Sequence, residues 1–474
     1  MHYYLRLSVL LAVTILTDVA TAQRWREISG RDQWSGLLDP LNIELRREII
    51  RYGELAQATS DAFIGDPASP YAGASRYGPG TFFYKVQAAD PGAYRVTRFL
   101  YATSSARLRD AFMTRPVPAG AWSTESNWMG YVAVATDGAA RALGRRDVVV
   151  AWRGTKRMVE WASDLDIVLV PAAGVVGPGG RGSVHRGFLS LYTSKNSTSR
   201  FNKQSAREQV LTEVRRLLDT YKDENCSVTL TGHSLGAALS TLNAIDIVAN
   251  GINALRSSSG DNITVPVTAI LFGSPRVGDE QFKKALDSMA GAVSLLRVRN
   301  APDIVPTILP TPFYRDVGVE LLVDTLKSPY LKTPAGPAQW HNLECYLHAV
   351  AGTQGPGDDA GFSLEVDRDV ALVNKEEDAL KGEYPVPASW WAENNKGMVK
   401  NATGHWVLED HEEGFCVLLD GVLTMETSSS RRLVFWLLRR PGVGVATYIM
   451  ESVVLTTRLF GLLVFFLMNS LMEK

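Results

Sequence analysis

The chain has 474 residues, of which 46% are hydrophobic and 21% charged, and its formal net charge is −1 at pH 7. This is the composition of a globular protein long enough for one large α/β domain with extensions or for a few smaller domains. The near-zero net charge excludes a general electrostatic attraction to nucleic acid. Three cysteines, Cys226, Cys345 and Cys416, match no metal-ligand spacing and allow at most one disulfide.

The first 22 residues have the pattern of a secretory signal. Arg6 precedes an apolar run from Leu7 to Leu16, and Ala20-Thr21-Ala22 matches the small-x-small cleavage pattern. We therefore expect a signal peptide over residues 1–22, with an ordinary apolar start as the alternative. A secreted chain would offer four N-x-S/T tripeptides for glycosylation, although such tripeptides also arise by chance: Asn196, Asn225, Asn262 and Asn401.

The next part of the chain predicts a helix and a pair of strands. Residues 39–56 have the spacing of an amphipathic helix, with Asp39 as its N-cap and Pro40 at its first position. Two β-rich runs follow, Trp128–Ala135 and Asp147–Trp152, separated by a stretch that opens with Asp-Gly. We expect the helix to cover the core and the two runs to form an antiparallel pair joined by a loop.

Strands and helices alternate through the middle of the chain. A helical pattern over residues 205–224 is followed at once by an apolar strand, 227–231. Two further apolar runs, 265–275 and 294–303, each end in polar loop residues and enclose a helical pattern at 279–290. This alternation is typical of a mostly parallel central sheet with helices on both faces. We therefore predict an α/β fold of that architecture.

The stretch VTLTGHSLGAALS, residues 228–240, places Ser234 between a predicted strand and the helix after it. A Gly-x-Ser-x-Gly pattern alone is weak evidence. In this context it is typical of a nucleophile elbow, a strained turn that projects the serine hydroxyl above the sheet. Gly232 and Gly236 flank the serine, where the turn requires small residues so that strand and helix can pass closely. The alternative is a serine that only caps the helix.

A serine nucleophile needs a base, and the base needs an acidic residue to orient it. In an elbow-type hydrolase these follow in the order Ser, Asp, His, from loops at the carboxyl edge of the sheet. Asp303 directly follows a predicted strand and is the candidate acid, with a loop cap or a surface charge as the alternative. His185 and His233 come too early to be the base. The candidate bases are the later histidines: His341, His348, His405 and His411.

Several motifs together resemble the class 3 lipase family: VVVAWRGT, EWASDLD, VHRGF, GHSLGAALS, FGSPRVGD, RNAPDIVP and WHNLECYLHAVAG. They occur in the family's order over about residues 24–414, and the leading helix and GHWVLEDHEEG are most similar to the plant class II phospholipases A1. The resemblance implies an α/β-hydrolase fold and hydrolysis of the sn-1 acyl ester of glycerophospholipids through an acyl-serine intermediate. It implies neither a metal nor a cofactor.

The resemblance also implies residue roles. Ser234 matches the acyl-forming serine, Asp303 the orienting aspartate and His341 the general base. His348 is the rival base, because it lies seven residues later, about two helical turns on and on the same face. The alternative interpretation is that His348 is a buried packing residue with no part in catalysis.

Positions outside the triad are assigned in the same way. The oxyanion hole is expected from the backbone N–H groups of Leu235 and Thr155. The glycine-rich stretch 171–183 is interpreted either as a mobile lip over the acyl site or as a surface connection. Two further motifs match structural elements: Trp161, Asp164 and Leu165 in one, and His185, Arg186, Gly187 and Phe188 in the other.

The triad does not distinguish lipid headgroups, so acylglycerols and galactolipids are alternative substrates. An alternative of another class is a noncatalytic signalling or lipid-binding protein. The presence of all three catalytic residue types, each in a sequence context that matches the family, argues against it. The expected partner is phospholipid at a membrane or micelle surface. The resemblance implies a cytoplasmic protein, in conflict with the secretory pattern of residues 1–22.

Residues 425–474 lie beyond the resemblance and combine apolar runs with arginines. The longest uninterrupted apolar run, Leu459–Met468, is shorter than the roughly 20 residues that cross a bilayer. We expect this tail to make peripheral contact with an anionic membrane surface, or else to have no role.

Overall fold

The computed structural model describes side chains and backbone for most of the chain, and backbone alone for residues 353–354 and for five short strands near its end. The residues described are 24–105, 113–155, 167–354, 362–384 and 386–391, together with 398–400, 406–408, 422–426, 432–438 and 447–450. The chain divides into two compact units, Met1–Gly397 and Met398–Lys474. The expected signal peptide at 1–22 and the expected domain end at residue 414 lie outside the described residues. Within the described ranges, no helix is both long and apolar enough to cross a membrane.

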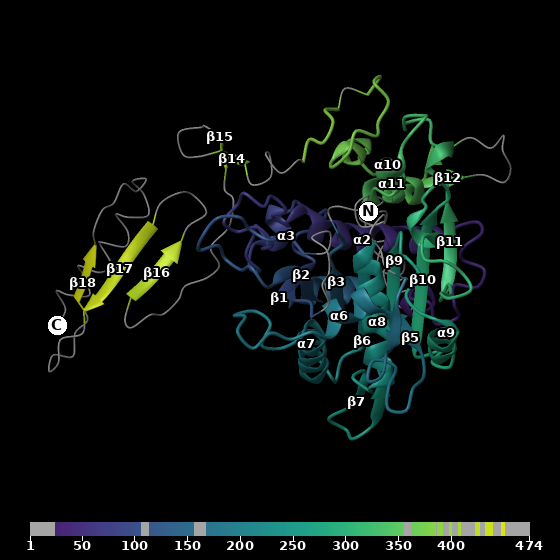
Figure 1. Cartoon of the computed structure of the whole chain (residues 1–474), viewed down its shortest axis with the longest axis horizontal. Helices are drawn as coiled ribbons and strands as arrows, with labels where there is room; N and C mark the ends of the chain where they lie inside the picture. The colour runs from purple at the N-terminus through teal and green to yellow at the C-terminus, as the bar shows by residue number, and fades with distance from the viewer. Residues whose placement is uncertain are drawn as a thin grey trace, which may run out of the picture. The chain divides into compact units, whose positions relative to one another are not determined.

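A seven-stranded sheet forms the centre of the first unit (Figure 1). In spatial order its strands are β1 (Tyr94–Ala102), β2 (Asn127–Ala135), β3 (Arg146–Trp152), β6 (Cys226–His233), β9 (Val267–Phe272), β10 (Val293–Asn300) and β11 (Val319–Val323). β1, β2 and β3 pair antiparallel, whereas every pair from β3 to β11 is parallel. The predicted antiparallel pair and the predicted mostly parallel sheet are both confirmed.

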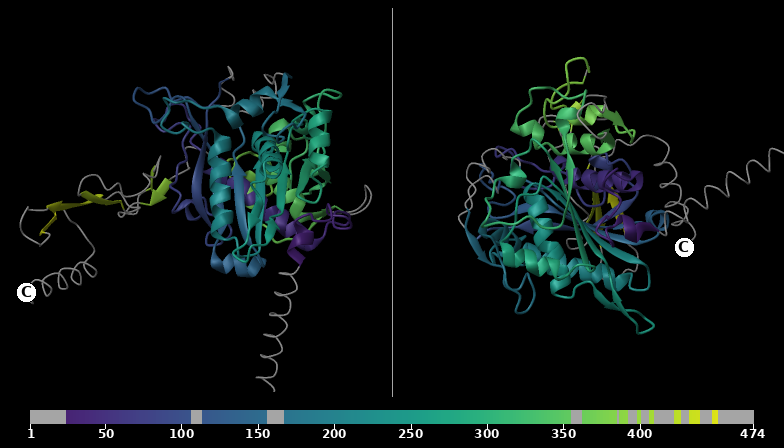
Figure 2. Two further views of the ribbon diagram at one scale, coloured as in Figure 1. Left: turned by 90° about the horizontal axis from the view of Figure 1, so that it is seen from below. Right: turned by 90° about the vertical axis from the view of Figure 1, so that its right-hand side faces the viewer.

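Helices cover both faces of this sheet (Figure 2). One face carries α2 (Ile43–Asp61) and α11 (Leu343–Ala351), and the other carries α6 (Arg186–Thr193), α7 (Ala206–Thr220) and α8 (Leu235–Ala249). Because successive strand residues point to opposite faces, Val148 and Val150 pack in the core with α7 and α8, while Val149 packs in the core with α2. Burial on both faces explains why β3 is continuously apolar. The α/β-hydrolase arrangement expected from the sequence is confirmed.

Shorter elements connect these layers. The short helices are α3 (Phe82–Lys85), α4 (Asp137–Leu143), α9 (Glu280–Asp287) and α10 (Pro337–Trp340), with 3-10 turns η1 (Val305–Thr307), η2 (Thr325–Lys327) and η3 (Val370–Asn374). Two-stranded pairs join β4 (Leu169–Pro171) to β5 (Ser183–His185), β7 (Ala254–Arg256) to β8 (Asn262–Thr264), and β12 (Gly352–Gln354) to β13 (Phe362–Leu364). In the second unit β14 (Met398–Lys400) pairs with β15 (Trp406–Leu408), and β16 (Val422–Glu426), β17 (Arg432–Leu438) and β18 (Thr447–Met450) form an antiparallel sheet.

Helix α2 begins later than the sequence pattern predicts. Asn42, not Asp39, is its cap: the side-chain oxygen of Asn42 accepts hydrogen bonds from two N–H groups of the first turn, at 2.9 and 3.2 Å. The predicted cap is wrong because Leu38 and Leu41 pair as an isolated β-bridge. That pairing holds the chain outside the helix until residue 41.

The stretch between β2 and β3 was expected to be a loop, but it contains helix α4. Thr136 caps this helix by accepting a hydrogen bond from the N–H of Ala139 at 3.4 Å. Asp137 then lies in the first turn, where a negative charge is favourable at the positive end of the helix dipole. The Asp-Gly pair therefore opens a helix rather than a hairpin turn.

The glycine-rich stretch 171–183 is anchored to the core by three buried residues and is otherwise largely exposed, so it fits the interpretation as a surface connection, and the interpretation as a lip over the acyl site is wrong. Ala172, Val175 and Val176 are buried in the core with α7 and α8. A Cβ atom on Gly177 would lie 2.9 Å from the carbonyl oxygen of Ala249, the last residue of α8. At 1.5 Å per residue, that end of α8 is about 22 Å from the elbow.

Candidate active site

Ser234 lies between β6 and α8 in a strained turn, with φ 57° and ψ −122°. Its N–H donates to the carbonyl oxygen of Phe272 in β9 at 2.9 Å, and its own carbonyl accepts from the N–H of Ala237 at 3.0 Å. Ser234 occupies the cap position of α8, but its side chain makes no cap hydrogen bond. The elbow geometry expected from the sequence is present, and the interpretation of Ser234 as a helix cap is wrong.

The two glycines beside the serine permit this turn. A Cβ atom on Gly232 would lie 2.4 Å from the carbonyl carbon of Gly236, and one on Gly236 would lie 2.1 Å from the carbonyl oxygen of Trp152. Both distances are far shorter than van der Waals contact, and both neighbours are backbone atoms that cannot rotate away. The expected requirement for small residues is therefore confirmed.

The loop after β3 lies beside the serine. β3 and β6 are parallel neighbours with Trp152 opposite Gly232, so the residues after each strand meet at the carboxyl edge of the sheet. A Cβ atom on Gly154 would lie 2.8 Å from the carbonyl oxygen of His233 and 3.7 Å from the Cβ of Ser234. This loop therefore packs directly against the elbow.

Thr155 and Leu235 are the residues whose N–H groups are expected to form the oxyanion hole. Thr155 is half-buried and directly follows the glycine that packs on the elbow. Leu235 is fully buried, and as the first residue of α8 its N–H group has no acceptor within the helix. Both backbone groups are thus close to the serine. The matched motif of Trp161, Asp164 and Leu165 lies outside the described residues.

Arg153 holds the loop after β3 from inside the protein. Its side chain is almost fully buried, and it donates to the carbonyl oxygens of Trp128 at 3.0 Å and Gly154 at 2.6 Å. The guanidinium carbon lies 3.6 Å from the ring centre of Phe63. Burial lowers the pKa of Arg153 to about 9. Sequence reasoning assigned this arginine no role, and its place at the end of β3 was the only available signal.

Asp303 and His341 form a buried pair. Nδ1 of His341 lies 2.6 Å from Oδ2 of Asp303, and both side chains are almost completely buried. Because Nδ1 is engaged by the carboxylate, Nε2 is the ring nitrogen left to exchange a proton. In the described part of the chain, neither Nε2 of His341 nor Oγ of Ser234 has a hydrogen-bond partner, although both are buried. The structure thus pairs the predicted acid with the predicted base and leaves two reactive atoms uncommitted.

Two local contacts fix the positions of these residues. Oδ1 of Asp303 accepts a hydrogen bond from the N–H of Val305 at 3.0 Å, which shapes the loop after β10. At the end of β10, the side chain of Asn300 donates to the carbonyl oxygen of Trp340 at 2.8 Å. The second bond ties the chain immediately before His341 to the strand that leads to Asp303.

His341 lies next to the elbow. A Cβ atom on Gly273 would lie 2.9 Å from Cε1 of His341, and the preceding residue, Phe272, accepts the N–H of Ser234. The ring centres of His341 and His233 are 4.4 Å apart. Burial, reinforced by the neighbouring His341, lowers the pKa of His233 to about 3, so His233 is neutral. Sequence reasoning excluded His233 as the base but missed its place in the site, for which its position directly before the serine was the signal.

Two other histidines have contacts of a structural kind. Nε2 of His348 lies 2.8 Å from the hydroxyl of Ser328, its ring stacks on Phe362 with 5.1 Å between centres, and burial lowers its pKa to about 4. Nδ1 of His185 accepts from two N–H groups of the first turn of α6, at 3.1 and 3.4 Å. These contacts favour packing for His348 and helix capping for His185. The remaining two candidates, His405 and His411, lie outside the described residues.

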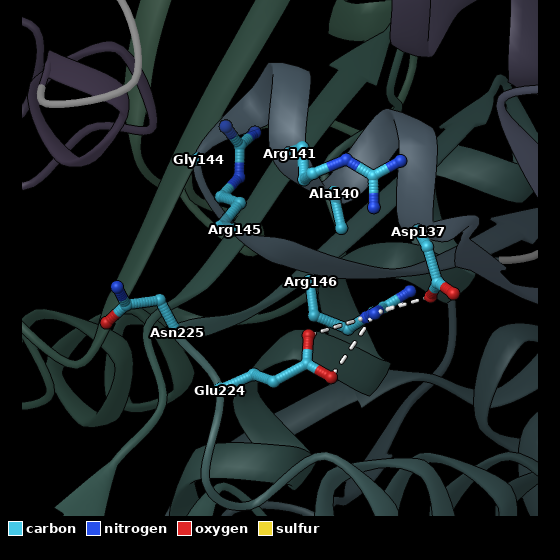
Figure 3. A pocket seen from close by; sticks show the side chains of 8 residues that line it. All are labelled: Asp137, Ala140, Arg141, Gly144, Arg145, Arg146, Glu224 and Asn225. Carbon is cyan, nitrogen blue, oxygen red and sulfur yellow. Dashed lines mark hydrogen bonds and ion pairs between the residues drawn. The ribbon is translucent and has the colours of Figure 1, made fainter. Parts of the chain in front are cut away.

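A hollow of about 500 Å³ lies at the opposite edge of the sheet, where α4 and the start of β3 meet the chain before β6 (Figure 3). The guanidinium group of Arg146 is bound there by Asp137 at 2.8 Å and by Glu224 at 2.9 Å. Arg145, next to it, forms an ion pair with Glu48. These internal pairs neutralise the charges of Arg145 and Arg146, and the hollow is separated from the elbow by the length of β6. Its contacts are those of a structural ion-pair cluster.

Comparisons with known proteins cover most of the chain. Residues 149–313 match the family model for Lipase (class 3). Phospholipase A1-II 3 of Oryza sativa subsp. japonica is 74% identical over 418 residues, which cover 87% of this chain and 98% of that protein. Phospholipase A1-II 1 of Oryza sativa subsp. indica is 55% identical over 394 residues, which cover 83% and 97%. Among solved structures, a Rhizomucor miehei triacylglyceride lipase is 21% identical, covers 60% of this chain and 81% of that chain, and has a TM-score of 0.38.

Proposed function

This chain belongs to the class 3 lipase family, among the plant class II phospholipases A1, and we propose that it is a serine hydrolase that releases the sn-1 acyl chain of glycerophospholipids. Two relatives named phospholipase A1 match this chain over nearly their whole length. One observation in the structure supports this chemistry most. Oγ of Ser234 and Nε2 of His341 are buried at the same edge of the sheet without hydrogen-bond partners in the described ranges.

The first half of the reaction forms the acyl-enzyme. Nε2 of His341 accepts the proton of Ser234, and Oγ attacks the carbonyl carbon of the sn-1 ester. Asp303 stabilises the imidazolium that results. The negative charge that develops on the carbonyl oxygen is stabilised by the N–H groups of Leu235 and Thr155. His341 then returns the proton to the leaving oxygen, and the lysophospholipid departs.

The second half repeats these steps with water. His341 takes a proton from a water molecule, the hydroxide attacks the acyl-serine, and the fatty acid leaves as Ser234 regains its proton. The positive φ of Ser234 supports both halves, because the turn holds the hydroxyl clear of the helix that follows. Every group that takes part in these reaction steps belongs to the chain, the substrate or water.

Product analysis tests the substrate and the position of cleavage together. The protein is incubated with phosphatidylcholine that carries different acyl chains at sn-1 and sn-2, with the Ser234→Ala variant as the control. We expect free fatty acid from sn-1 and lysophosphatidylcholine that retains the sn-2 chain. Release of the sn-2 chain, or hydrolysis of acylglycerols or galactolipids with no action on phosphatidylcholine, would contradict the proposal. Binding of these lipids without any product would indicate the noncatalytic alternative.

We also propose that residues 425–474 bind anionic membrane surfaces. Arg431, Arg432, Arg439 and Arg440 flank the apolar sequence LVFWLL. Basic residues next to an anionic surface each contribute about 1 kcal/mol of binding free energy. For the compartment, we propose that the protein enters the secretory pathway, because residues 1–22 have the pattern of a secretory signal. The alternative is a cytoplasmic protein.

A further inference from the structure

Asp303 accepts two hydrogen bonds on a single oxygen. Nδ1 of His341 lies 2.6 Å from Oδ2, and the hydroxyl of Tyr346 donates to the same oxygen at 2.5 Å. Oδ1 accepts a third hydrogen bond, from the N–H of Val305 at 3.0 Å. The carboxylate is therefore held by groups from the loop after β10, from the residue after α10 and from α11.

Tyr346 reaches this carboxylate from within the core. Its side chain is fully buried, with its ring edge-on to the ring of His233 at 6.3 Å between centres. A Cβ atom on Gly273 would lie 3.2 Å from the Tyr346 hydroxyl, which shows how closely the chain surrounds it. Burial, and then the charge of Asp303, raise the pKa of Tyr346 well above its usual value. Burial therefore favours the protonated form of the hydroxyl, which is the form that donates to Asp303.

We propose that Tyr346 is a positioning residue for the hydrolysis, which orients Asp303 and limits how strongly its carboxylate stabilises the protonated form of His341. This inference rests on the proposed function. Two donors on one oxygen draw on the same negative charge, so each hydrogen bond is weaker than it would be alone. Loss of the Tyr346 hydroxyl leaves the whole charge of Oδ2 to His341 and frees the carboxylate to rotate.

The other ionisable groups around this pair are few in the described part of the chain. His233 faces His341 from the end of β6 and is neutral. The positive charge of Arg299 in β10 favours a lower pKa for Tyr346, and the Arg299 side chain donates a hydrogen bond to Glu320 at 3.1 Å. The negative charge of Glu376, which follows η3, favours a higher pKa for His233, and Glu376 accepts a hydrogen bond from Ser60 at 2.6 Å. Tyr346→Phe leaves all three of these groups in the chain and removes only the hydroxyl, so a change in pH dependence reports on the hydroxyl.

The variant Tyr346→Phe removes only this oxygen. We expect kcat to fall about tenfold with KM changed less than about twofold, because the lost interaction orients the base rather than the lipid. We also expect the acid limb of the kcat/KM profile to move up by about half a pH unit. The direction follows because His341 must lose its proton before it acts as a base, and an unshared carboxylate holds that proton more firmly.

The matched control is Tyr131→Phe. The Tyr131 hydroxyl is also fully buried, but it donates to the carbonyl oxygen of Leu55 at 2.8 Å and does not touch Asp303 or His341. We expect this control to lose thermal stability to a similar extent while its kcat and acid limb stay those of the wild type. If Tyr346→Phe gives the same result as the control, Tyr346 is purely structural and the inference is wrong. A wild-type protein that releases no fatty acid would instead overturn the proposed function.

A second measurement removes no hydroxyl group from the protein. Replacement of all tyrosines by 3-fluorotyrosine makes the hydroxyl facing Asp303 a stronger donor, so the acid limb of the otherwise wild-type protein is expected to move to lower pH. This shift is opposite in sign to that of Tyr346→Phe. An unchanged limb in the fluorinated protein would overturn the inference.

Discussion

His341 and Asp303 are separated by 38 residues of chain, yet Nδ1 of the histidine lies 2.6 Å from the carboxylate of the aspartate. The aspartate follows β10, and the histidine lies between α10 and α11. The hydrogen bond from Asn300 to Trp340 ties these two segments together independently of the pair itself. Because of this separate anchor, single substitutions in the pair are expected to change chemistry more than fold.

Ser234→Ala is expected to abolish hydrolysis without unfolding the protein. The hydroxyl has no hydrogen-bond partner within the described ranges, so its removal costs little stability. Loss of the nucleophile in such a triad lowers kcat by about 10⁶. Fatty-acid release by the purified variant, with circular dichroism as the check of folding, measures both effects. Turnover near the wild-type rate in a folded variant would exclude Ser234 as the nucleophile.

His341→Ala and His348→Ala are expected to have opposite effects. His341→Ala removes the base and should lower kcat by a factor of about 10⁴ or more. His348→Ala breaks a buried hydrogen bond to Ser328 and a ring contact with Phe362, so it should lower stability by about 2 kcal/mol and keep measurable turnover. Urea unfolding and turnover per folded molecule separate the two. The reverse pattern would transfer the role of base to His348.

Acid pH is expected to destabilise the fold through His348. Burial lowers the pKa of His348 to about 4 in the folded state, against about 6.5 when unfolded. The unfolded chain therefore takes up a proton first, and the stabilisation present above pH 6.5 is lost as the pH falls towards 4. Between pH 7 and pH 5 this loss is about 2 kcal/mol.

Urea unfolding at these two pH values measures this loss. His233, with its pKa lowered to about 3, adds a loss in the same direction. His348→Gln should therefore reduce the acid loss by about 2 kcal/mol without removing it. An acid loss equal to that of the wild type would show that His348 is not the titrating group.

Gly236→Ala is expected to disrupt the elbow. The added methyl group would lie 2.1 Å from the carbonyl oxygen of Trp152, so β3 and α8 must separate, at a cost of about 1 to 3 kcal/mol. Gly138→Ala is the control, because no atom lies within 4 Å of its added methyl group. Thermal unfolding and esterase activity are compared for both variants. Equal behaviour of the two would mean that the close approach at Gly236 is not required.

Truncation after Gly414 is expected to weaken membrane binding without changing hydrolysis of a soluble short-chain ester. The measurement is sedimentation with anionic liposomes, in which the difference should be largest at low salt because salt screens the arginine charges. Equal sedimentation of the truncated and full-length proteins would exclude a membrane role for residues 425–474. Loss of esterase activity would place the tail within the catalytic domain.

The sequence predicted those features that depend on residues close together in the chain. The elbow at Ser234 is an example, because strand, turn and helix adjoin, and β2 with β3 is another. Local rules failed where two local choices compete: Asp39 and Asn42 both fit a helix cap, and the bridge between Leu38 and Leu41 decides between them.

The pairing of Asp303 with His341 was expected from the family resemblance, but the other contacts between distant segments were beyond the sequence patterns. Tyr346 has the spacing of an ordinary core residue of a helix, and its hydrogen bond to Asp303 depends on the packing of α11 against the end of β10. Arg153 and His233 acquire their contacts in the same way, from strands that are neighbours only in the folded sheet. The pattern of one chain records which side chains are buried, but not which distant polar group each one meets.

Helix α2 covers one face of the sheet from outside residues 149–313, the part of the chain that matches the family model. A recombinant fragment cut to that match would lack α2, β1, β2, the first three residues of β3 and His341. It would expose the face of β3 that carries Val149 to water, and its unpaired β3 would become an open edge, which favours aggregation. The smallest fragment worth expressing therefore runs from the residues before α2 to beyond α11, well past both ends of the recognisable family match.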